Sequence, residues 1–449
     1  MKSIRALRAK TAWKQTAPAI FLVMNSFVWY ILTNILFGAA LNNLNVTTIE
    51  KTELFGTYFA SMALSALVGA KFFPRRRTKL LNLWLLMGIV ATFFLITIST
   101  NGLTANALLA IFLGASIGVG LPSCLSYFAD STTVENRGLI GGIIWSGVGF
   151  VVLALAFLIG PLPQWETVVA LALWRLLGTV GFPILNRGHV QPAPQKSPKY
   201  LEIVRKREIL LYWFPWVMFA LINFAETPIL DIAFNSVFGP NFFEFLQLAE
   251  FAFIGIFAIM GGAIADKEGR KKVVIAGFIM LGIEYAMITV FSISLITGFL
   301  FLTLDGITWG LLFSVFFTVL WGDLGENREK EKYYTLGGLP YLLAGFLPIL
   351  IRPYAEGFST GTAFSLASFF LFLAVIPLMY APETLPEKTM KDRDLKSYLE
   401  KAQKLVQKKT EKNEKRDMEK TKKENEEANE ETQESPEDEE ARKLAEKYY

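Results

Sequence analysis

The sequence predicts an all-α polytopic membrane protein with twelve transmembrane helices in two six-helix halves, followed by a charged tail. Three observations predict this fold. Apolar segments of about 20 residues recur along the chain, basic residues fall in alternate loops, and short motifs repeat at a constant separation. Composition agrees, because 53% of the 449 residues are hydrophobic and 19% are charged, a balance too apolar for a soluble domain. Soluble enzymes, secreted domains and nucleic-acid modules are therefore disfavoured.

The chain has one cysteine, Cys124, and one histidine, His189. An intramolecular disulfide, a zinc cage and a Cys/His catalytic pair are therefore excluded or disfavoured. The phosphate-binding loop G-x-x-x-x-G-K-[ST] does not occur in the sequence, which disfavours direct use of ATP. We expect no metal, no cofactor and no enzymatic activity.

The predicted spans suit a bilayer, whose hydrocarbon core of roughly 30 Å takes about 20 residues of helix. They comprise residues 19–41, 54–73, 80–99, 105–127, 139–160, 165–185, 209–229, 246–265, 273–294, 297–321, 336–351 and 360–380. The eleventh contains Pro340 and Pro348, and residues 295–296 alone divide the ninth from the tenth. The first span has no small-residue cleavage site, so we expect it to act as the insertion signal.

The basic residues support this number of spans. Of the 27 Lys and Arg in residues 1–386, 24 lie before the first span or in the loops after the second, fourth, sixth, eighth and tenth. Because cytoplasmic loops are rich in Lys and Arg, the alternation predicts that both termini are cytoplasmic. The expected location is the cell (plasma) membrane, as a multi-pass protein.

Matching residues in the two halves lie 193 positions apart. Arg77 and Arg270 form one such match, and Asp130 and Asp323 form another. The repeat predicts two parallel halves with a solute site between them near the midplane. The predicted division is a first half of residues 1–185, a cytoplasmic linker of 186–208, a second half of 209–386 and a tail of 387–449.

The tail differs in composition from the rest of the chain, because it holds 36 of the 84 charged residues. An apolar stripe from Leu395 to Val406, surrounded by Lys and Arg, predicts a basic amphipathic helix that contacts the anionic inner leaflet. After Lys423 the sequence is acidic and predicts a solvated helix or disorder. A soluble tail without a partner is the alternative.

The segment from Gly262 to Lys272 reads G-A-I-A-D-K-E-G-R-K-K. It resembles the cytoplasmic-loop signature of the major facilitator superfamily, G-x-x-x-D-[RK]-x-G-R-[RK], at every specified position. The residue types suit the place, because Gly262 permits close helix packing and Gly269 permits a tight turn. In that family the motif is a latch that holds one state of the access cycle. The resemblance thus implies that Asp266 and Arg270 are latch residues that do not touch the solute.

The resemblance covers residues 1–386 and has two departures from the family pattern. The loop between spans 2 and 3 has Phe73 in the place of the acid and Arg76 in the place of the second glycine. Span 5 ends in Gly160-Pro161 without the further glycines of the antiporter signature. The second departure argues against the familiar drug/proton antiporters.

The resemblance also implies that spans 1, 4, 7 and 10 line the solute cavity. Those spans carry polar and aromatic residues at helical spacing. The candidate solute- or proton-binding residues are Asn25, Trp29, Trp216, Asn223, Glu226, Asp305 and Trp309. Aromatic stripes also arise from helix packing, and Asn also ties helices together, so a structural role is the alternative for the uncharged candidates.

The carboxylates are the strongest candidates, because an ionised carboxylate near the midplane costs a few kcal/mol even on insertion scales. Asp305 lies roughly 13 Å inside the outer boundary, where we expect a proton carrier or a cation site; a structural hydrogen bond is the alternative. Glu226 lies nearer the outer mouth and is equally consistent with a solvated carboxylate. Arg175 and Glu284 lie mid-span on supporting helices, which favours structural pairing or packing. Glu250 fits either role.

We therefore expect a secondary transporter that moves a small neutral or cationic organic solute by alternating access, with proton coupling. The four lining spans contain no Lys or Arg, which disfavours an anionic solute. The expected partners are the solute and the lipid bilayer, without nucleic acid, and we expect a monomer. The alternatives are a non-transporting receptor or scaffold that signals through the tail, and a facilitator without coupling.

The topology predicts a labelling pattern. A cysteine introduced at Asn43 or Phe238, in predicted outer loops, should react with an impermeant thiol reagent in intact cells, whereas one at Ser197 or Glu268 should not. The native Cys124 is first replaced by serine to remove background labelling. Reaction at Ser197 in intact cells would contradict the two-half topology.

Overall fold

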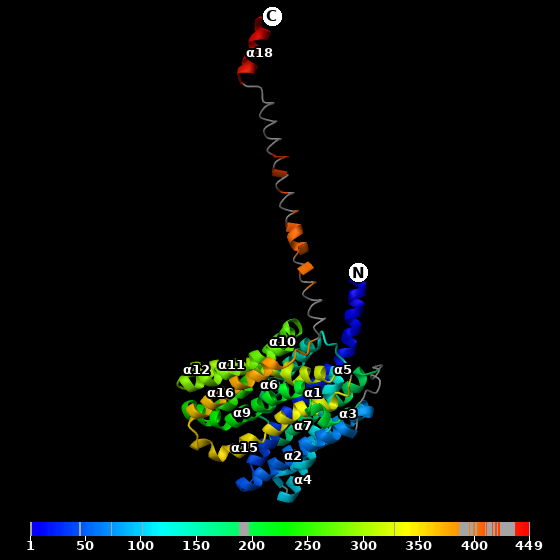
Figure 1. The fold of residues 1–449 in the computed structure, drawn as a ribbon, viewed down its shortest axis with the longest axis vertical. Helices are drawn as coiled ribbons and strands as arrows, with labels where there is room; N and C mark the ends of the chain where they lie inside the picture. Colours follow the sequence, from blue (N-terminus) through cyan, green and yellow to red (C-terminus); the bar gives the residue numbers. More distant parts are fainter. Residues whose placement is uncertain are drawn as a thin grey trace. The chain divides into compact units, whose positions relative to one another are not determined.

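The structure is a computed structural model. It describes residues 2–44, 46–72, 74–100, 102–187, 197–326 and 328–385, and in the tail residues 395, 398–399, 402–408, 410, 415, 418–419, 421–422 and 436–448. Residues 1–386 form one compact unit and residues 387–449 a second. In the first unit, α2, α3 and α4 gather on one side and α11, α12 and α16 on the other (Figure 1).

The first half holds six helices of membrane-spanning length. Its elements are α1 (Lys2–Asn42), α2 (Thr48–Phe72), η1 (Pro74–Arg76), α3 (Arg77–Phe94), η2 (Leu95–Thr100), α4 (Leu103–Gly118), α5 (Leu121–Asp130), α6 (Arg137–Ile159) and α7 (Gln164–Leu185). The fourth span consists of α4 and α5 together.

The second half holds the other six spans, and the short α8 (Tyr200–Val204) precedes it. Its elements are α9 (Arg207–Phe238), α10 (Phe242–Glu268), α11 (Arg270–Val290), α12 (Leu295–Leu311), the π-helix η3 (Leu312–Leu320), α13 (Trp321–Leu324), α14 (Glu331–Ala344), α15 (Leu347–Ile351), η4 (Arg352–Gly357) and α16 (Thr360–Tyr380). The tenth span combines α12, η3 and α13, and the eleventh combines α14, α15 and η4. The described residues thus contain twelve candidate spans, which confirms the predicted number.

Two spans are interrupted for local reasons. The fourth breaks at Gly120, where a Cβ would lie 2.1 Å from Cδ2 of Trp84, and Pro122 lies in the first turn of α5. The eleventh breaks at Gly345, ahead of Pro348 in the first turn of α15. Proline suits the first turn of a helix, because the N–H that it lacks would have no partner within the helix there.

The connection between the ninth and tenth spans is longer than the sequence predicts. The pattern assigns residues 291–294 to the ninth span, whereas α11 ends at Val290 and α12 begins at Leu295. Phe291 has an extended backbone, and Ser294 caps α12 by accepting a hydrogen bond from the Thr297 N–H at 3.2 Å. Capping by serine sets the helix start at this point.

A glycine seam joins α6 of the first half to α10 of the second. A Cβ on Gly142 would lie 2.4 Å from the carbonyl oxygen of Ala258, and one on Gly262 would lie 2.1 Å from that of Gly138. Only residues without a Cβ let two backbones approach so closely. The seam holds the start of α6 against the end of α10.

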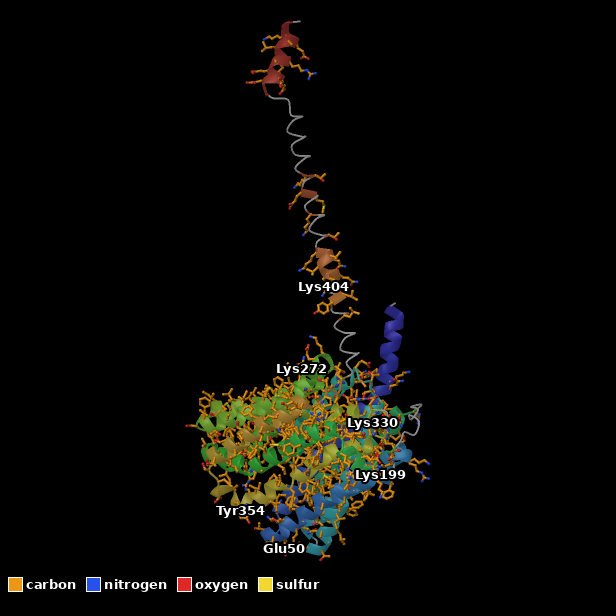
Figure 2. The ribbon with its side chains drawn as sticks, in the orientation of Figure 1. Glu50, Lys199, Lys272, Lys330, Tyr354 and Lys404 are labelled. Atoms are coloured by element: carbon orange, nitrogen blue, oxygen red, sulfur yellow. The ribbon has the colours of Figure 1, made fainter. Side chains whose placement is uncertain are left out.

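Large apolar side chains are exposed on the flanks of the first unit, among them Leu83, Leu173, Phe299 and Phe369. An apolar surface of this kind is stable when lipid covers it. Glu50 and Tyr354 lie toward one end of the helical body and Lys272 toward the other (Figure 2).

The tail is helical where the structure describes it at length. Helix α18 spans Pro436–Tyr448, and Lys443 Nζ lies 3.0 Å from Glu439 Oε1, one turn earlier. Residues 402–408 are helical with exposed side chains. Within and just before the predicted basic amphipathic helix, residues 391–394, 396–397 and 400–401 lie outside the described residues. Contact with the inner leaflet stays a prediction.

The seam predicts that Gly142→Ala lowers the free energy of unfolding by about 1–3 kcal/mol, because the added Cβ overpacks the contact. Gly338→Ala is the matched control, since the space within 4 Å of a Cβ there is open. The same change in that helix should gain about 0.5–1 kcal/mol. Thermal unfolding of the purified protein measures both, and equal unfolding temperatures for the two variants would contradict the seam.

Candidate functional site

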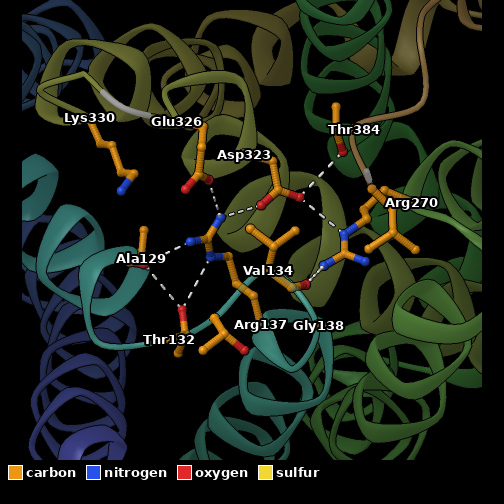
Figure 3. A network of polar contacts seen from close by, with 12 residues as sticks. Ala129, Thr132, Val134, Arg137, Gly138, Arg270, Asp323, Glu326, Lys330 and Thr384 are labelled. Carbon is orange, nitrogen blue, oxygen red and sulfur yellow. Dashed lines mark hydrogen bonds and ion pairs between the residues drawn. The ribbon is translucent and has the colours of Figure 1, made fainter. Parts of the chain in front are cut away.

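Charged side chains from both halves meet in one network (Figure 3). It lies at the end of the helical body where α6 and α11 begin and α10 ends. Arg137, at the start of α6, forms an ion pair with Asp323 of α13. Arg270, at the start of α11, places Nε 3.1 Å from the other oxygen of Asp323. All three residues are buried. Asp323 therefore holds one base from its own half and one from the other, and we call these three residues the Asp323 triad.

Both arginines of the triad also donate to backbone carbonyl groups. Arg137 Nη2 donates to Ala129 O at 2.8 Å, and Arg270 Nη1 donates to Ala265 O at 3.1 Å. A buried ion pair offsets its desolvation only when additional hydrogen bonds engage the remaining donors. These carbonyl groups provide such bonds.

Asp266 joins the halves by a different interaction. Its carboxylate accepts the backbone N–H groups of Gly138 at 2.9 Å and Leu139 at 2.8 Å. It also lies 3.0 Å from Arg270 Nη2. The unpaired N–H groups at a helix N-terminus attract negative charge. Asp266 of α10 thus caps α6 across the boundary between the halves.

Gly269 makes the turn that leads into α11. Its φ of 110° favours glycine, and a Cβ would lie 2.4 Å from Oε2 of Glu383. Glu383 accepts the N–H groups of Arg270 at 2.9 Å and Lys271 at 3.2 Å, so it caps α11. The four residues of the predicted latch therefore lie together, beside or within the Asp323 triad.

A second triad repeats the first. Asp130, at the end of α5, forms ion pairs with Arg77 of its own half at 2.6 Å and with Lys330 of the other half. We call Arg77, Asp130 and Lys330 the Asp130 triad. The equivalent members, each 193 residues apart, are Arg77 with Arg270, Asp130 with Asp323, and Arg137 with Lys330.

Arg77 also lies 2.6 Å from Glu331, the first residue of α14 in the second half. The loop before Arg77 departs from the family signature, but the first half still contacts the second through Arg77. Phe73, which stands in the place of the signature acid, lies outside the described residues. Sequence reasoning missed Arg137 and Lys330 as functional residues, although the 193-residue repeat relates them.

Aromatic rings from both halves meet in the middle of the body. Trp145 of α6 stacks on Phe313 of η3, with ring centroids 4.1 Å apart. Trp216 of α9 and Trp309 of α12 both pack on Phe219, at 5.2 and 4.9 Å between centroids. Trp309 also packs on Phe313, at 4.6 Å. The structure thus brings two predicted residues, Trp216 and Trp309, into one aromatic centre.

Asp305 lies beside a second carboxyl group. Its side chain is in hydrogen-bond contact with Glu250 of α10 and interacts with Trp309, one turn later on α12. We call Asp305 and Glu250 the carboxyl pair. Asp305 and Glu284 of α11 are both buried. One oxygen of Asp305 and both oxygens of Glu284 have no hydrogen-bond partner among the described residues.

Asn25 and Trp29 lie inside the first half, around Arg175. Asn25 Oδ1 accepts from Arg175 Nη1 at 3.3 Å, and its amide donates to the Trp174 carbonyl at 2.7 Å. The guanidinium carbon of Arg175 lies 4.4 Å from the Trp29 ring centroid and 4.5 Å from that of Trp84, a cation–π arrangement. In the described contacts these two candidates engage Arg175 rather than the carboxyl pair.

Asn223 and Glu226 lie one turn apart on α9. The Tyr285 hydroxyl donates to Asn223 Oδ1 at 3.1 Å. Glu226 is buried and lines a cavity of about 510 Å³ between α9, η4 and α16. Asp305 is not among the described residues that line this cavity. The structure therefore places the two predicted carboxylates in different surroundings.

Comparisons with known proteins agree with this architecture. The sequence profile described as Major Facilitator Superfamily matches residues 19–331. The structure is similar to the crystal structure of the human organic anion transporter MFSD10 (TETRAN), with a TM-score of 0.60 and 14% sequence identity over 82% of this chain and 99% of that one. At this identity the similarity shows the fold alone. No curated protein matches the sequence.

Asp266→Asn should leave the protein folded and shift the balance between closed and open states at this end by about 1–3 kcal/mol, a usual size for conformational coupling. The amide keeps an acceptor oxygen but loses the charge that attracts Arg270 and the N-terminus of α6. The rate at which a cysteine in place of the buried Ser123 reacts with a small thiol reagent measures the opening, in a Cys124→Ser background.

Asp231→Asn is the control for this experiment, because the ion pair of Asp231 with Arg352 lies within the second half. It should leave the reactivity at position 123 unchanged. If Asp266→Asn also leaves that reactivity unchanged, the latch motif is inert in this protein.

Proposed function

Because the chain belongs to the Major Facilitator Superfamily of membrane transporters, we propose that it moves a small neutral or cationic organic solute across the membrane by alternating access, coupled to protons. The carboxyl pair of Asp305 and Glu250 carries this proposal. It lies among transmembrane helices, where ionisable residues are rare and mark ion or solute pathways. Asp305 interacts with Trp309, a member of the aromatic centre.

The carboxyl pair suits a proton carrier. Two carboxyl groups in hydrogen-bond contact hold a proton between them, because two carboxylates at that distance repel each other. Glu284 interacts electrostatically with both groups and adds to that repulsion. Loss of the shared proton therefore leaves a charge that water or a cationic solute must offset. Proton and solute thus act at one place, as coupling requires.

The distribution of charge supports a neutral or cationic solute. Glu250, Glu284 and Asp305 lie on three helices of the second half, and all interact electrostatically. Arg175, a buried cation of the first half that belongs to neither triad, is covered by two Trp rings. An anionic solute would need Arg175, two of whose nitrogens have no partner in the described part of the chain. The rings over the guanidinium disfavour that alternative.

The two triads support alternating access. They join the halves at one end, so opening this end separates Arg137 from Asp323 and Lys330 from Asp130. Water must then replace both ion pairs, because an unpaired buried charge costs several kcal/mol. The basic loops place this end on the cytoplasmic side in the predicted topology. In the proposed cycle, this end opens when the opposite end closes.

Two alternatives make different predictions for purified protein in proteoliposomes. A receptor or scaffold that signals through the tail would show no uptake of any solute. A facilitator without coupling would show uptake that a pH gradient does not drive. A thermal-shift screen against neutral and cationic metabolites supplies the solute for these measurements.

Asp305→Asn tests the proposed coupling, because the amide keeps the size and hydrogen bonding of the side chain but cannot titrate. If Asp305 carries the proton, the variant should still exchange solute at equal concentrations, while accumulation driven by a pH gradient disappears. If Asp305 instead binds a cationic solute, exchange and binding should fall together. Proteoliposome assays of exchange and accumulation measure both.

Glu244→Gln is the control for Asp305→Asn, since Glu244 is an exposed acid in the first turn of α10. It should accumulate solute as the native protein does. Normal accumulation by Asp305→Asn, with the native pH profile, would exclude both roles of Asp305.

A further inference from the structure

A lateral cavity of about 510 Å³ lies on the flank of the second half, between α9, η4 and α16. This volume is in the usual range for sites that bind small organic molecules, roughly 300–1,000 Å³. Its wall is mainly apolar and includes Ile222, Ile229, Leu366 and Phe370. Among the described lining residues, Glu226 alone carries a charge. The cavity is thus an apolar space with one carboxylate.

Glu226 forms no ion pair in the described part of the chain. The residue is 7% exposed, and its Oε2 is buried without a hydrogen-bond partner in the described part of the chain. Asp231, the next acid on α9, pairs with Arg352 instead. A buried carboxylate oxygen without a donor is costly, so the unmet acceptor of Glu226 points to a ligand that supplies a donor.

The exposed residues that line the cavity include large apolar side chains. Leu221 is 49% exposed, Phe358 54% and Leu366 53%, and all three line the cavity. On the flank of a membrane-spanning bundle, exposed apolar side chains contact lipid tails. A ligand that reaches this cavity therefore comes from the bilayer and needs an apolar body.

We propose that this lateral cavity binds protonated lipophilic amines from the bilayer, with the ammonium group at Glu226 and the apolar body between α9 and α16. A carboxylate attracts an ammonium donor, repels a fatty acid, and gains little from an uncharged hydrocarbon. The inference rests on the proposed function, because it specifies the cationic class of solute for this transporter.

The position of Glu226 on α9 suits a site on the route to the aromatic centre. One turn before it, Asn223 accepts a hydrogen bond from Tyr285 of α11 at 3.1 Å. One further turn back, Phe219 packs on Trp309 with centroids 4.9 Å apart, and Trp309 interacts with Asp305. One helix thus connects the lateral cavity with the carboxyl pair.

The test uses the full chain in nanodiscs of phosphatidylcholine and two photoreactive probes, a diazirine-bearing decylamine and the matching decanol. Mass spectrometry should locate the amine on peptides that include residues 221–229 and 362–370. Glu226→Gln should reduce amine labelling roughly tenfold or more, as expected for loss of a charged hydrogen bond. Labelling by the alcohol should be weaker and unaffected by this change.

Three further variants keep the result interpretable. Glu244→Gln, an exposed acid on α10, should leave amine labelling unchanged. Glu226→Asp keeps the charge and should retain the preference for the amine. Ala363→Phe, which fills the cavity without touching the charge, should reduce labelling by both probes. Thermal unfolding confirms that each variant is folded before labelling.

Two outcomes would overturn the proposal. Equal labelling by the amine and the alcohol, insensitive to Glu226→Gln, would show that the cavity has no preference for cations. Phosphatidylethanolamine also carries an ammonium group. If replacing half of the lipid with it abolishes amine labelling, the site binds a lipid headgroup. Either result leaves the proposed proton coupling intact, because that depends on accumulation by Asp305→Asn and not on binding at Glu226.

Discussion

The crossed ion pairs around Asp130 and Asp323 are the interaction on which this conformation depends. Each aspartate holds one base from its own half and one from the other, so neither half satisfies its own charges alone. Removing one partner of a buried ion pair costs about 3–5 kcal/mol. The halves therefore cannot separate contact by contact, and this end opens only when water replaces both triads together. The glycine seam between α6 and α10 brings the charged helix ends close enough for these bonds.

The two halves share an architecture but differ in their buried charges. Away from the triads, the described part of the first half buries Arg175 between two Trp rings, whereas the second half has Glu284 and Asp305 buried, with Glu250 beside Asp305. The latch at one end and these acids of the second half, which have no basic partner among the described residues, suit different tasks. In the proposed function, the latch sets which end is open, and the acids respond to protons and cations. Placement of both tasks in one chain is what secondary transport requires.

The sequence predicts the fold well, because hydropathy and the alternation of Lys and Arg are enforced along the whole chain by the bilayer. The 193-residue repeat also relates Arg77 to Arg270 and Asp130 to Asp323, but it does not indicate that their ion pairs cross between halves. The sequence does not show how each helix is rotated about its axis, and so which of its residues face a neighbouring helix. The pairing of Glu250 with Asp305 depends on how α10 and α12 face each other. Likewise, Asn25 and Trp29 face Arg175 because α1 is turned toward α7 and α3.

The distance across the latched end tests the central claim most directly. Spin labels at the exposed positions Thr133 and Lys267, one in each half, report that distance by pulsed electron resonance. We predict one short distance in the native protein. Asp130→Asn and Asp323→Asn should each add a minor longer population, and the double variant should shift most molecules to the longer distance, beyond the sum of the single effects. An unchanged distance distribution in the double variant would contradict the account.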